Sequence, residues 1–246
     1  MNNNQLNKEH WDKLNKKYSE VWKSKAKQEL SKKEMAFISY YLKIIKPKLI
    51  LDIGVGNGRV VTNYINNSSA DAKIYGIDVA PNMVDYCKEL FINELKVKEI
   101  KTCDIAKDNI CFIDNFDFIS AIRVLKYNQN WIEIVGNIYE KLNNNGIFIF
   151  TMPNSQSISG FHRDTFSEHK LPIIYTTSSE LKKILKDIGF EIIEIKAFSR
   201  VPDFLYNLNN SNFYTKTLLF IESFLELIFG KKFLGRYFFI ACKKIN

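Results

Sequence analysis

The chain has 246 residues, of which 46% are hydrophobic and 14% aromatic, which excludes a disordered protein and suffices for one large α/β domain. The polar start, MNNNQLNKEHWDK, lacks the apolar segment of a signal peptide, and no apolar run is long enough for a membrane-spanning helix. We therefore expect a cytoplasmic protein. The net charge is +8, and residues 1–48 carry twelve lysines and five acidic residues, a net of +7. This bias is compatible with a nucleic-acid surface, an anionic small substrate or ordinary solvated helix faces.

Two helices are predicted at the amino terminus, over residues 8–28 and 31–46, because apolar residues recur at helical spacing and Pro47 follows. Short strands then alternate with helices. The strands are predicted at 48–53, 73–78, 97–104, 116–122 and 146–152. This alternation implies parallel strands with right-handed crossovers in a doubly wound sheet. Ligands bind such sheets beyond the carboxyl ends of the strands.

The second half of the chain is less regular. A long loop is predicted over 153–176, and a capping box from Thr177 to Glu180 opens a helix that Gly189 ends. The remaining predicted elements are a strand at 190–198, an apolar helix at 213–229 and a strand at 236–245. The four cysteines show no Cys-x-x-Cys spacing, so we expect reduced, buried thiols and no metal site.

The stretch LDIGVGNGRVV carries the clearest signal for a ligand. Gly58-Arg59-Val60 lacks the lysine and hydroxyl of a phosphate-binding P-loop, and Arg59 replaces the third glycine of the dinucleotide fingerprint. Asp52, at the end of the first strand of the sheet, suits a ligand with a positive amine. The next two strands end in Asp78, which can accept ribose hydroxyls, and in Asp104. An acid followed by apolar Ile105 suits an adenine, so the three acids describe an amine, a ribose and an adenine without phosphate. Asp52 and Asp104 could instead simply cap turns.

The chain resembles the class I SAM-dependent methyltransferases over roughly residues 48–200. The matching stretches are LDIGVGNG, IDVAPNM, CDI, FDFISAIRVLKY and LNNNGIFIF, in that order. The resemblance implies an α/β fold with a doubly wound, mostly parallel, Rossmann-like seven-stranded sheet, amino-terminal helices and a helical insertion before the last strand. We accordingly divide the chain into a helical cap at 1–47 and a SAM-binding domain at 48–246. That domain contains a substrate loop at 153–176 and the insertion at 201–234.

The resemblance implies a role for each matching residue. Gly54 and Gly56 would line the methionine moiety of S-adenosyl-L-methionine (SAM), and Asp52 would hold its amino group. Asp78 would take the ribose hydroxyls, and Asp104 the adenine amino group. The full set implied to bind SAM is Asp52, Gly54, Gly56, Gly58, Asp78, Val79, Met83, Asp104, Ile105, Ala121, Arg123 and a lid residue, Tyr18.

Two features near this set are less clear from the sequence. Trp11 and Trp22 share the helical stripe of Tyr18, and we expect the stripe to belong to the core more than to a lid. Ala80 stands where the family often has a hydroxyl that caps a helix. The cap is therefore expected to come from elsewhere, with Asp78 as the candidate.

The acceptor is less clearly indicated than the cofactor. A hydroxyl acceptor usually needs a general base, and the candidates are His162 and His169, with Tyr127 to orient the acceptor. Guanidinium groups bind anions bidentately. The candidate substrate-binding residues are Arg59, Arg123, Tyr127 and Arg163. We expect O-methylation of a small anionic or sugar-derived acceptor.

A second, weaker resemblance suggests a narrower class of acceptor. The stretch RVLKYNQNW, the helix at 213–229 and the ending FFIACKK are similar to methyltransferases of bacterial surface-polysaccharide biosynthesis. A capsule precursor, such as a sugar or a phosphoramidate, would be the acceptor.

Three alternatives remain open. A tRNA or rRNA methyltransferase would explain the basic amino terminus, but the Asn/Asp-Pro-Pro-aromatic motif of the amino-directed members is absent, and nucleic acid is an unlikely partner. The chain could also bind SAM without catalysis, as an interaction protein. The apolar helix at 213–229 could form a homodimer contact.

Overall fold

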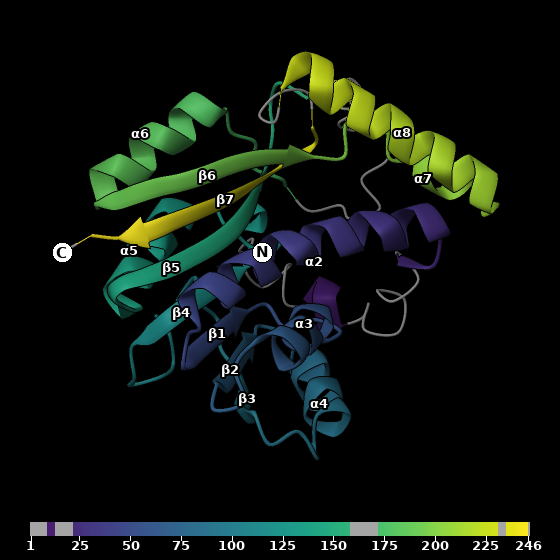
Figure 1. The fold of residues 1–246 in the computed structure, drawn as a ribbon. Coiled ribbons are helices and arrows are strands. Elements are labelled where there is room, and N and C mark those ends of the chain that lie inside the picture. Colours follow the sequence, from purple (N-terminus) through teal and green to yellow (C-terminus); the bar gives the residue numbers. More distant parts are fainter. Residues whose placement is uncertain (1–8, 13–21, 158–171, 231–234, 246) are drawn as a thin grey trace.

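The centre of the computed structural model is a seven-stranded sheet in the order β3-β2-β1-β4-β5-β7-β6 (Figure 1). The structure describes residues 9–12, 22–157, 172–230 and 235–245. The strands are β1 (Leu49–Ile53), β2 (Lys73–Asp78), β3 (Val97–Thr102), β4 (Phe116–Ala121), β5 (Leu142–Pro153), β6 (Phe190–Phe198) and β7 (Tyr237–Lys244). Strands β1 to β5 are parallel, whereas β7 runs antiparallel to both β5 and β6. The expected fold class, a mostly parallel seven-stranded sheet, is confirmed.

Helices cover both faces of the sheet. They are α2 (Lys25–Ile45), α3 (Arg59–Asn67), α4 (Pro81–Leu90), a short 3₁₀ helix η2 (Leu125–Tyr127), α5 (Trp131–Lys141), α6 (Ser178–Ile188), α7 (Leu205–Leu208) and α8 (Asn212–Phe229). One core joins α2, α3, α4 and α8 to the sheet, and a second core lies under α5 and α6. The strands are apolar because parallel strands are buried on both faces. Most element boundaries agree with the sequence within a few residues, including the α6 capping box of Thr177 and Glu180.

Three expectations about local structure are wrong. The break between two amino-terminal helices is not at 28–31, because α2 is continuous there. Helix α2 begins directly after Ser24, whose backbone is extended and whose hydroxyl caps the helix by accepting from the Lys27 N–H. Strand β5 begins at Leu142, four residues before the predicted start at Gly146. Cys103 and Cys111 form a disulfide, whereas Cys87 and Cys242 are free and buried.

This topology gathers the residues singled out by the sequence at one edge of the sheet. Asp52, Asp78 and Ala121 lie at or next to the carboxyl ends of β1, β2 and β4, three adjacent strands. Tyr237 begins β7 opposite Pro153 at the end of β5, so β7 contributes its first residue to the same edge.

Candidate functional site

A cavity of about 780 Å³, including its open mouth, lies at this edge. Nine of the residues expected to bind cofactor or substrate line it. They are Gly54, Gly56, Asp78, Val79, Met83, Asp104, Ile105, Arg123 and Tyr127. Ile122, within the span from Ala121 to Arg123 that the family resemblance implies, also lines the cavity. Six further lining residues were missed from the sequence: Trp11, Ile53, Ile77, Cys103, Val124 and Asn128. Most of the missed residues are apolar. At the end of a strand, an apolar residue that lines a cavity has the same sequence pattern as one that packs in the core.

The glycine loop after β1 approaches its neighbours closely. A Cβ on Gly54 would lie 2.3 Å from Cγ2 of Val124, and the backbone there has a φ of +79°. Both conditions require glycine. The N–H groups of Gly54 and Val55 donate to the carbonyl of Ile77, at 2.7 and 3.1 Å, and fix the loop against β2. The loop thus keeps bare backbone at the cavity wall.

Asp78 connects this loop to the start of α4. Its Oδ2 accepts a hydrogen bond from Gly56 N–H (2.9 Å), and its Oδ1 accepts one from Ala80 N–H (3.0 Å). Burial raises the pKa of Asp78, and these backbone donors oppose that rise. Each oxygen has a further lone pair that a ribose hydroxyl could use. The α4 terminus gains a second acceptor from outside, since Asp12 Oδ1 accepts from Asn82 N–H (3.1 Å).

Asp52 is a buried carboxyl group with one unsatisfied oxygen. The Ser120 hydroxyl donates a hydrogen bond to Asp52 Oδ1 and accepts one from the Tyr64 hydroxyl, both at 2.5 Å. Within the described residues, Asp52 Oδ2 has no hydrogen-bond partner. Burial, together with the nearby charge of Asp78, raises the pKa of Asp52 to about 8, against the opposing hydrogen bond from Ser120. Asp52 does not line the cavity itself, although Ile53 and Gly54 do. A ligand ammonium group would favour the charged carboxylate and satisfy this oxygen.

The far end of the cavity is formed by the loop after β3. Ile105 and Met83 line it together with Asp104. Asp104 Oδ1 accepts from Ala106 N–H (3.2 Å), which orders the loop, and Lys107 Nζ lies 3.4 Å from Oδ2. This end combines two apolar side chains with an acceptor, as an adenine requires.

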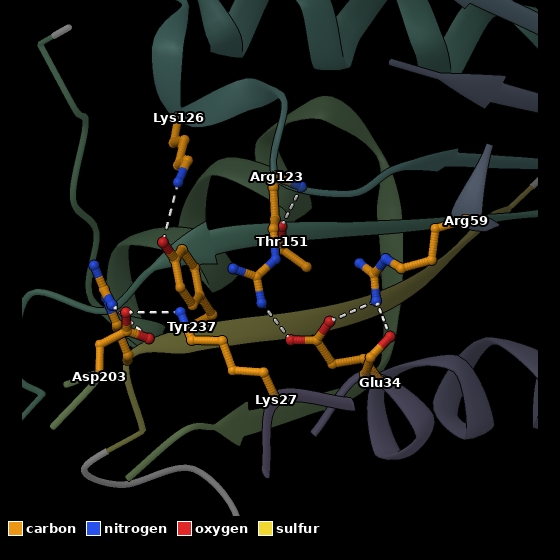
Figure 2. Close-up of polar contacts among 10 residues, drawn as sticks. Lys27, Glu34, Arg59, Arg123, Lys126, Thr151, Asp203 and Tyr237 are labelled. Atoms are coloured by element: carbon orange, nitrogen blue, oxygen red, sulfur yellow. Dashed lines mark hydrogen bonds and ion pairs between the residues drawn. The ribbon is translucent and has the colours of Figure 1, made fainter. Parts of the chain in front are cut away.

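The opposite end combines aromatic groups with a cation. Trp11, expected in a core stripe, instead lines the cavity and packs edge-to-face on Tyr127, with ring centroids 5.2 Å apart. Arg123 lines the cavity with a φ of +66°, and its N–H donates to Thr151 Oγ1 (2.7 Å) (Figure 2). A non-glycine residue in this conformation is strained, and such strain concentrates at functional sites. The candidates Tyr18, His162, Arg163 and His169 lie outside the described residues.

Glu34 of α2 joins two of the candidate arginines (Figure 2). Its side chain is 1% exposed and accepts from Arg123 Nη2 (2.5 Å) and Arg59 Nη1 (3.1 Å). The guanidinium groups of Arg59 and Arg123 also lie over the Trp22 ring, 4.2 and 4.9 Å from its centroid. Arg59 is therefore held by Glu34 and does not line the cavity; neither do Gly58 and Ala121. The sequence signal that we missed is an acid in the buried stripe of α2, four residues from both Leu30 and Ile38.

The part of the chain that the structure describes shows neither a metal site nor a membrane-spanning helix. Within the described ranges, no group of three His, Cys, Asp or Glu side chains is placed to hold a metal ion. None of the helices that the structure describes has the length and apolarity to cross a membrane.

Comparison with known proteins matches the family model "Methyltransferase domain" to residues 23–195. Protein 235L of Invertebrate iridescent virus 6, which is named as a methyltransferase, is 39% identical over 69 residues, 28% of this chain and 24% of its own length. The chain thus spans about a quarter of the curated relative that it matches.

Two solved structures share the fold at low identity. One belongs to the complex between the Haloferax volcanii Trm112 methyltransferase activator and a methyltransferase, with a TM-score of 0.65, 13% identity and coverage of 96% of this chain and 95% of that chain. The other is magnesium protoporphyrin IX methyltransferase from Synechocystis PCC 6803 with bound S-adenosylhomocysteine, with a TM-score of 0.64, 12% identity and coverage of 99% and 100%.

Proposed function

Because this chain belongs to the methyltransferase-domain family and has the class I SAM-dependent fold, we propose that it transfers the methyl group of SAM to a small acceptor. S-adenosyl-L-homocysteine (SAH) is the second product. The observation that carries the proposal is one cavity bordered by the Gly54 turn, Asp78 and Asp104, next to the unsatisfied carboxyl of Asp52. These groups match the amine, ribose and adenine of SAM.

SAM supplies an already activated methyl group, so the chain mainly has to align the acceptor and exclude water. The ribose would lie on Asp78 and the adenine between Met83 and Ile105. The methionine end would pass the Gly54 turn toward Asp52. Trp11 and Tyr127 would then screen the transferred methyl group from solvent, because their rings line the same cavity.

The acceptor would enter on the side of Arg123 and Tyr127. A cation that lines the cavity favours an anionic or sugar-derived acceptor, methylated on oxygen, such as a precursor of a surface polysaccharide. His162 and His169 remain the candidate bases, and Arg163 remains a candidate contact of the acceptor.

The cofactor part is tested by SAH binding to Asp78→Asn, measured by calorimetry. We expect an affinity loss of at least about tenfold, because a ribose hydroxyl then faces an amide in place of a carboxylate. Asp85→Asn, on the exposed side of α4, is the matched control and should bind SAH normally. Equal SAH affinity of Asp78→Asn and the wild type would overturn the cofactor assignment.

The acceptor part is tested by SAH release with candidate acceptors and by RNA binding. Turnover with a phosphorylated sugar but not with tRNA supports the proposal. Salt-sensitive tRNA binding together with tRNA methylation would replace the small acceptor by nucleic acid. Absence of turnover with every acceptor class would favour a SAM-binding interaction protein.

We also propose that α8 forms a homodimer contact. Its outer face presents several large apolar side chains, with Phe213 and Leu227 each 82% exposed. The acids of α8 do not interrupt this face, because Glu222 is buried and Glu226 pairs with Lys196 and Arg200. Apolar patches of this kind mark protein contacts.

A further inference from the structure

Beside the cavity, a second group of charged residues surrounds the ring of Tyr237 (Figure 2). Lys126 Nζ donates to the Tyr237 hydroxyl oxygen (3.0 Å), and the guanidinium groups of Arg123 and Arg236 lie 4.6 and 5.5 Å from the ring centroid. Tyr237 and Lys126 are only 6% and 5% exposed. Three cations thus converge on one buried phenol.

The carboxylates that the structure describes near this group do not balance its positive charge. Asp203 is shared between Lys27 Nζ and Arg236 Nη1, each at 3.1 Å. Lys126 forms no ion pair with a carboxylate in the described part of the chain, and its hydrogen bond goes to the phenol. Among the described residues, Lys27 and Arg236 thus share one carboxylate and Lys126 has none, which leaves two positive charges. Buried charges are normally paired, so this excess points to an anionic ligand.

The backbone holds this group rigidly at the functional edge. Arg236 N–H donates to Ser199 O (2.8 Å), and Asn154 N–H donates to Arg236 O (2.9 Å). On the other side, Ile174 N–H donates to Lys126 O (2.9 Å). Arg123 lines the cavity and also lies over the Tyr237 ring, so the two sites are contiguous. The side chains of Arg236 and Asp203 are 34% and 43% exposed, so this end of the group is in contact with solvent.

We propose that Lys126, Arg236 and Tyr237, next to Arg123, form an anion subsite that binds a phosphomonoester group of the methyl acceptor. This inference rests on the proposed function and adds to it the charged group by which the acceptor is held. Guanidinium and ammonium donors chelate phosphate, and two excess positive charges match a phosphate dianion better than a monocarboxylate. The phenol hydroxyl adds a neutral hydrogen-bonding group between the cations.

The charge state of Tyr237 supports the same assignment. Burial by itself would raise the pKa of Tyr237, but Lys126, Arg236 and Arg123 lower it to about 7. Asp203, whose own pKa is lowered by Arg236 and Lys27 against its burial, stays ionised. The other groups that face this cluster are Lys27, Tyr127 and Tyr175. Above neutral pH, Tyr237 would therefore be a phenolate. Its negative charge would neutralise part of the positive charge that an anionic ligand needs.

The first experiment titrates the full chain, saturated with SAH, with inorganic phosphate at pH 6.5, followed by calorimetry. We expect Lys126→Met and Arg236→Gln each to weaken phosphate binding by at least about tenfold, and Lys126→Arg to restore most of it. Lys182→Met, on the exposed face of α6, is the matched control and should bind as the wild type does. Phosphate affinity that is undetectable in the wild type, or unchanged in both variants, overturns the subsite.

The second experiment uses sulfate, whose charge is constant across the pH range. In the wild type, sulfate affinity should fall as the pH rises through 7, because the phenolate forms and repels the ligand. In Tyr237→Phe the fall should disappear, while the affinity at pH 6 stays within about threefold of the wild type. An identical pH profile in both proteins would contradict the role of Tyr237.

The outcomes separate this inference from the proposed function. Failure to bind SAH would contradict the cofactor assignment, whereas SAH binding without phosphate binding would contradict only the anion subsite. A third arm titrates a single-stranded RNA. Loss of RNA binding in Lys126→Met, without an effect on inorganic phosphate, would assign the cations to a nucleic-acid backbone and overturn the proposal.

Discussion

At the scale of single residues, Gly54 sets the shape of the cavity wall. Its alanine variant would place a Cβ 2.3 Å from Val124 and force a left-handed φ on a residue with a side chain. We expect Gly54→Ala to lower the free energy of unfolding by at least about 2 kcal/mol and to weaken SAH binding. Denaturant titration and calorimetry measure the two effects.

Gly136 provides the control for this variant. It lies within α5, and a Cβ there would meet no atom within 4 Å. Gly136→Ala should therefore stabilise the protein by roughly 0.5–1 kcal/mol, through helix propensity alone, and leave SAH binding unchanged. Equal effects of the two variants would show that the contact of Gly54 with Val124 does not shape the site.

Asp52 should make the stability of the protein dependent on pH. Its folded-state pKa of about 8 lies well above the value of about 3.9 in an unfolded chain, so the folded state holds the proton between these two values. Stability should therefore fall as the pH rises from 5 to 8, with a slope of up to about 1.4 kcal/mol per pH unit. Asp52→Asn should flatten this slope in thermal or denaturant unfolding.

A second group, Tyr237, also makes the stability of the protein depend on pH. Tyr237, whose pKa is lowered to about 7, should make stability rise between pH 7 and 10, opposite in sign to Asp52. The difference in unfolding free energy between the wild type and Asp52→Asn, taken at each pH, gives the contribution of the Asp52 carboxyl group alone, because Tyr237 contributes equally to both proteins. A wild-type slope that Asp52→Asn reproduces would contradict the raised pKa.

Sequence reasoning succeeded for residues whose signal is local. The Gly54 turn and Asp78 follow strand ends directly, so their place at the sheet edge follows from the alternation of elements. Glu34 and Tyr237 were missed because their partners, Arg123 and Lys126, lie far along the chain. Only the closed sheet brings those charges together, and a charge excess is visible only once the partners are known.

At the scale of elements, α2 is fastened to the sheet by its buried acid. Glu34 bridges Arg59 at the start of α3 and Arg123 beyond β4. We expect Glu34→Gln to destabilise the protein by about 3–5 kcal/mol, since two largely buried cations lose their shared carboxylate. It should also weaken SAH binding by releasing Arg123. Chemical denaturation and calorimetry measure these changes.

The exposed ion pair on the same helix is the matched comparison. Glu29 lies 2.6 Å from Lys32, both near the surface, and Glu29→Gln should cost less than about 1 kcal/mol. If Glu34→Gln were equally mild, the bridge would contribute little to the fold. The same helix also shows a limit of sequence patterns, because its amphipathic stripe did not reveal that α2 begins at Lys25.

At the scale of the whole molecule, the outer face of α8 is the clearest unexplained surface. The helix packs against α2 and turns the other face outward (Figure 1). We expect Phe220→Glu and Phe224→Glu to shift a dimer to monomer in sedimentation velocity, because a carboxylate would be buried at the contact. Both side chains are more than half exposed, so unfolding stability should change little. A wild-type monomer at every concentration would contradict the homodimer.

The antiparallel strand β7 has a consequence for how the molecule is made. It is the last of the seven strands to be synthesised, yet it lies between β5 and β6, and within the described sheet β6 pairs with β7 alone. Until the ribosome has extended the chain past Lys244, β5 therefore keeps an open hydrogen-bonding edge and β6 has no place in the sheet. Nascent chains and products of early termination would expose aggregation-prone strands. The acceptor side of the site, to which Tyr237 of β7 contributes, is therefore also incomplete until β7 has been made.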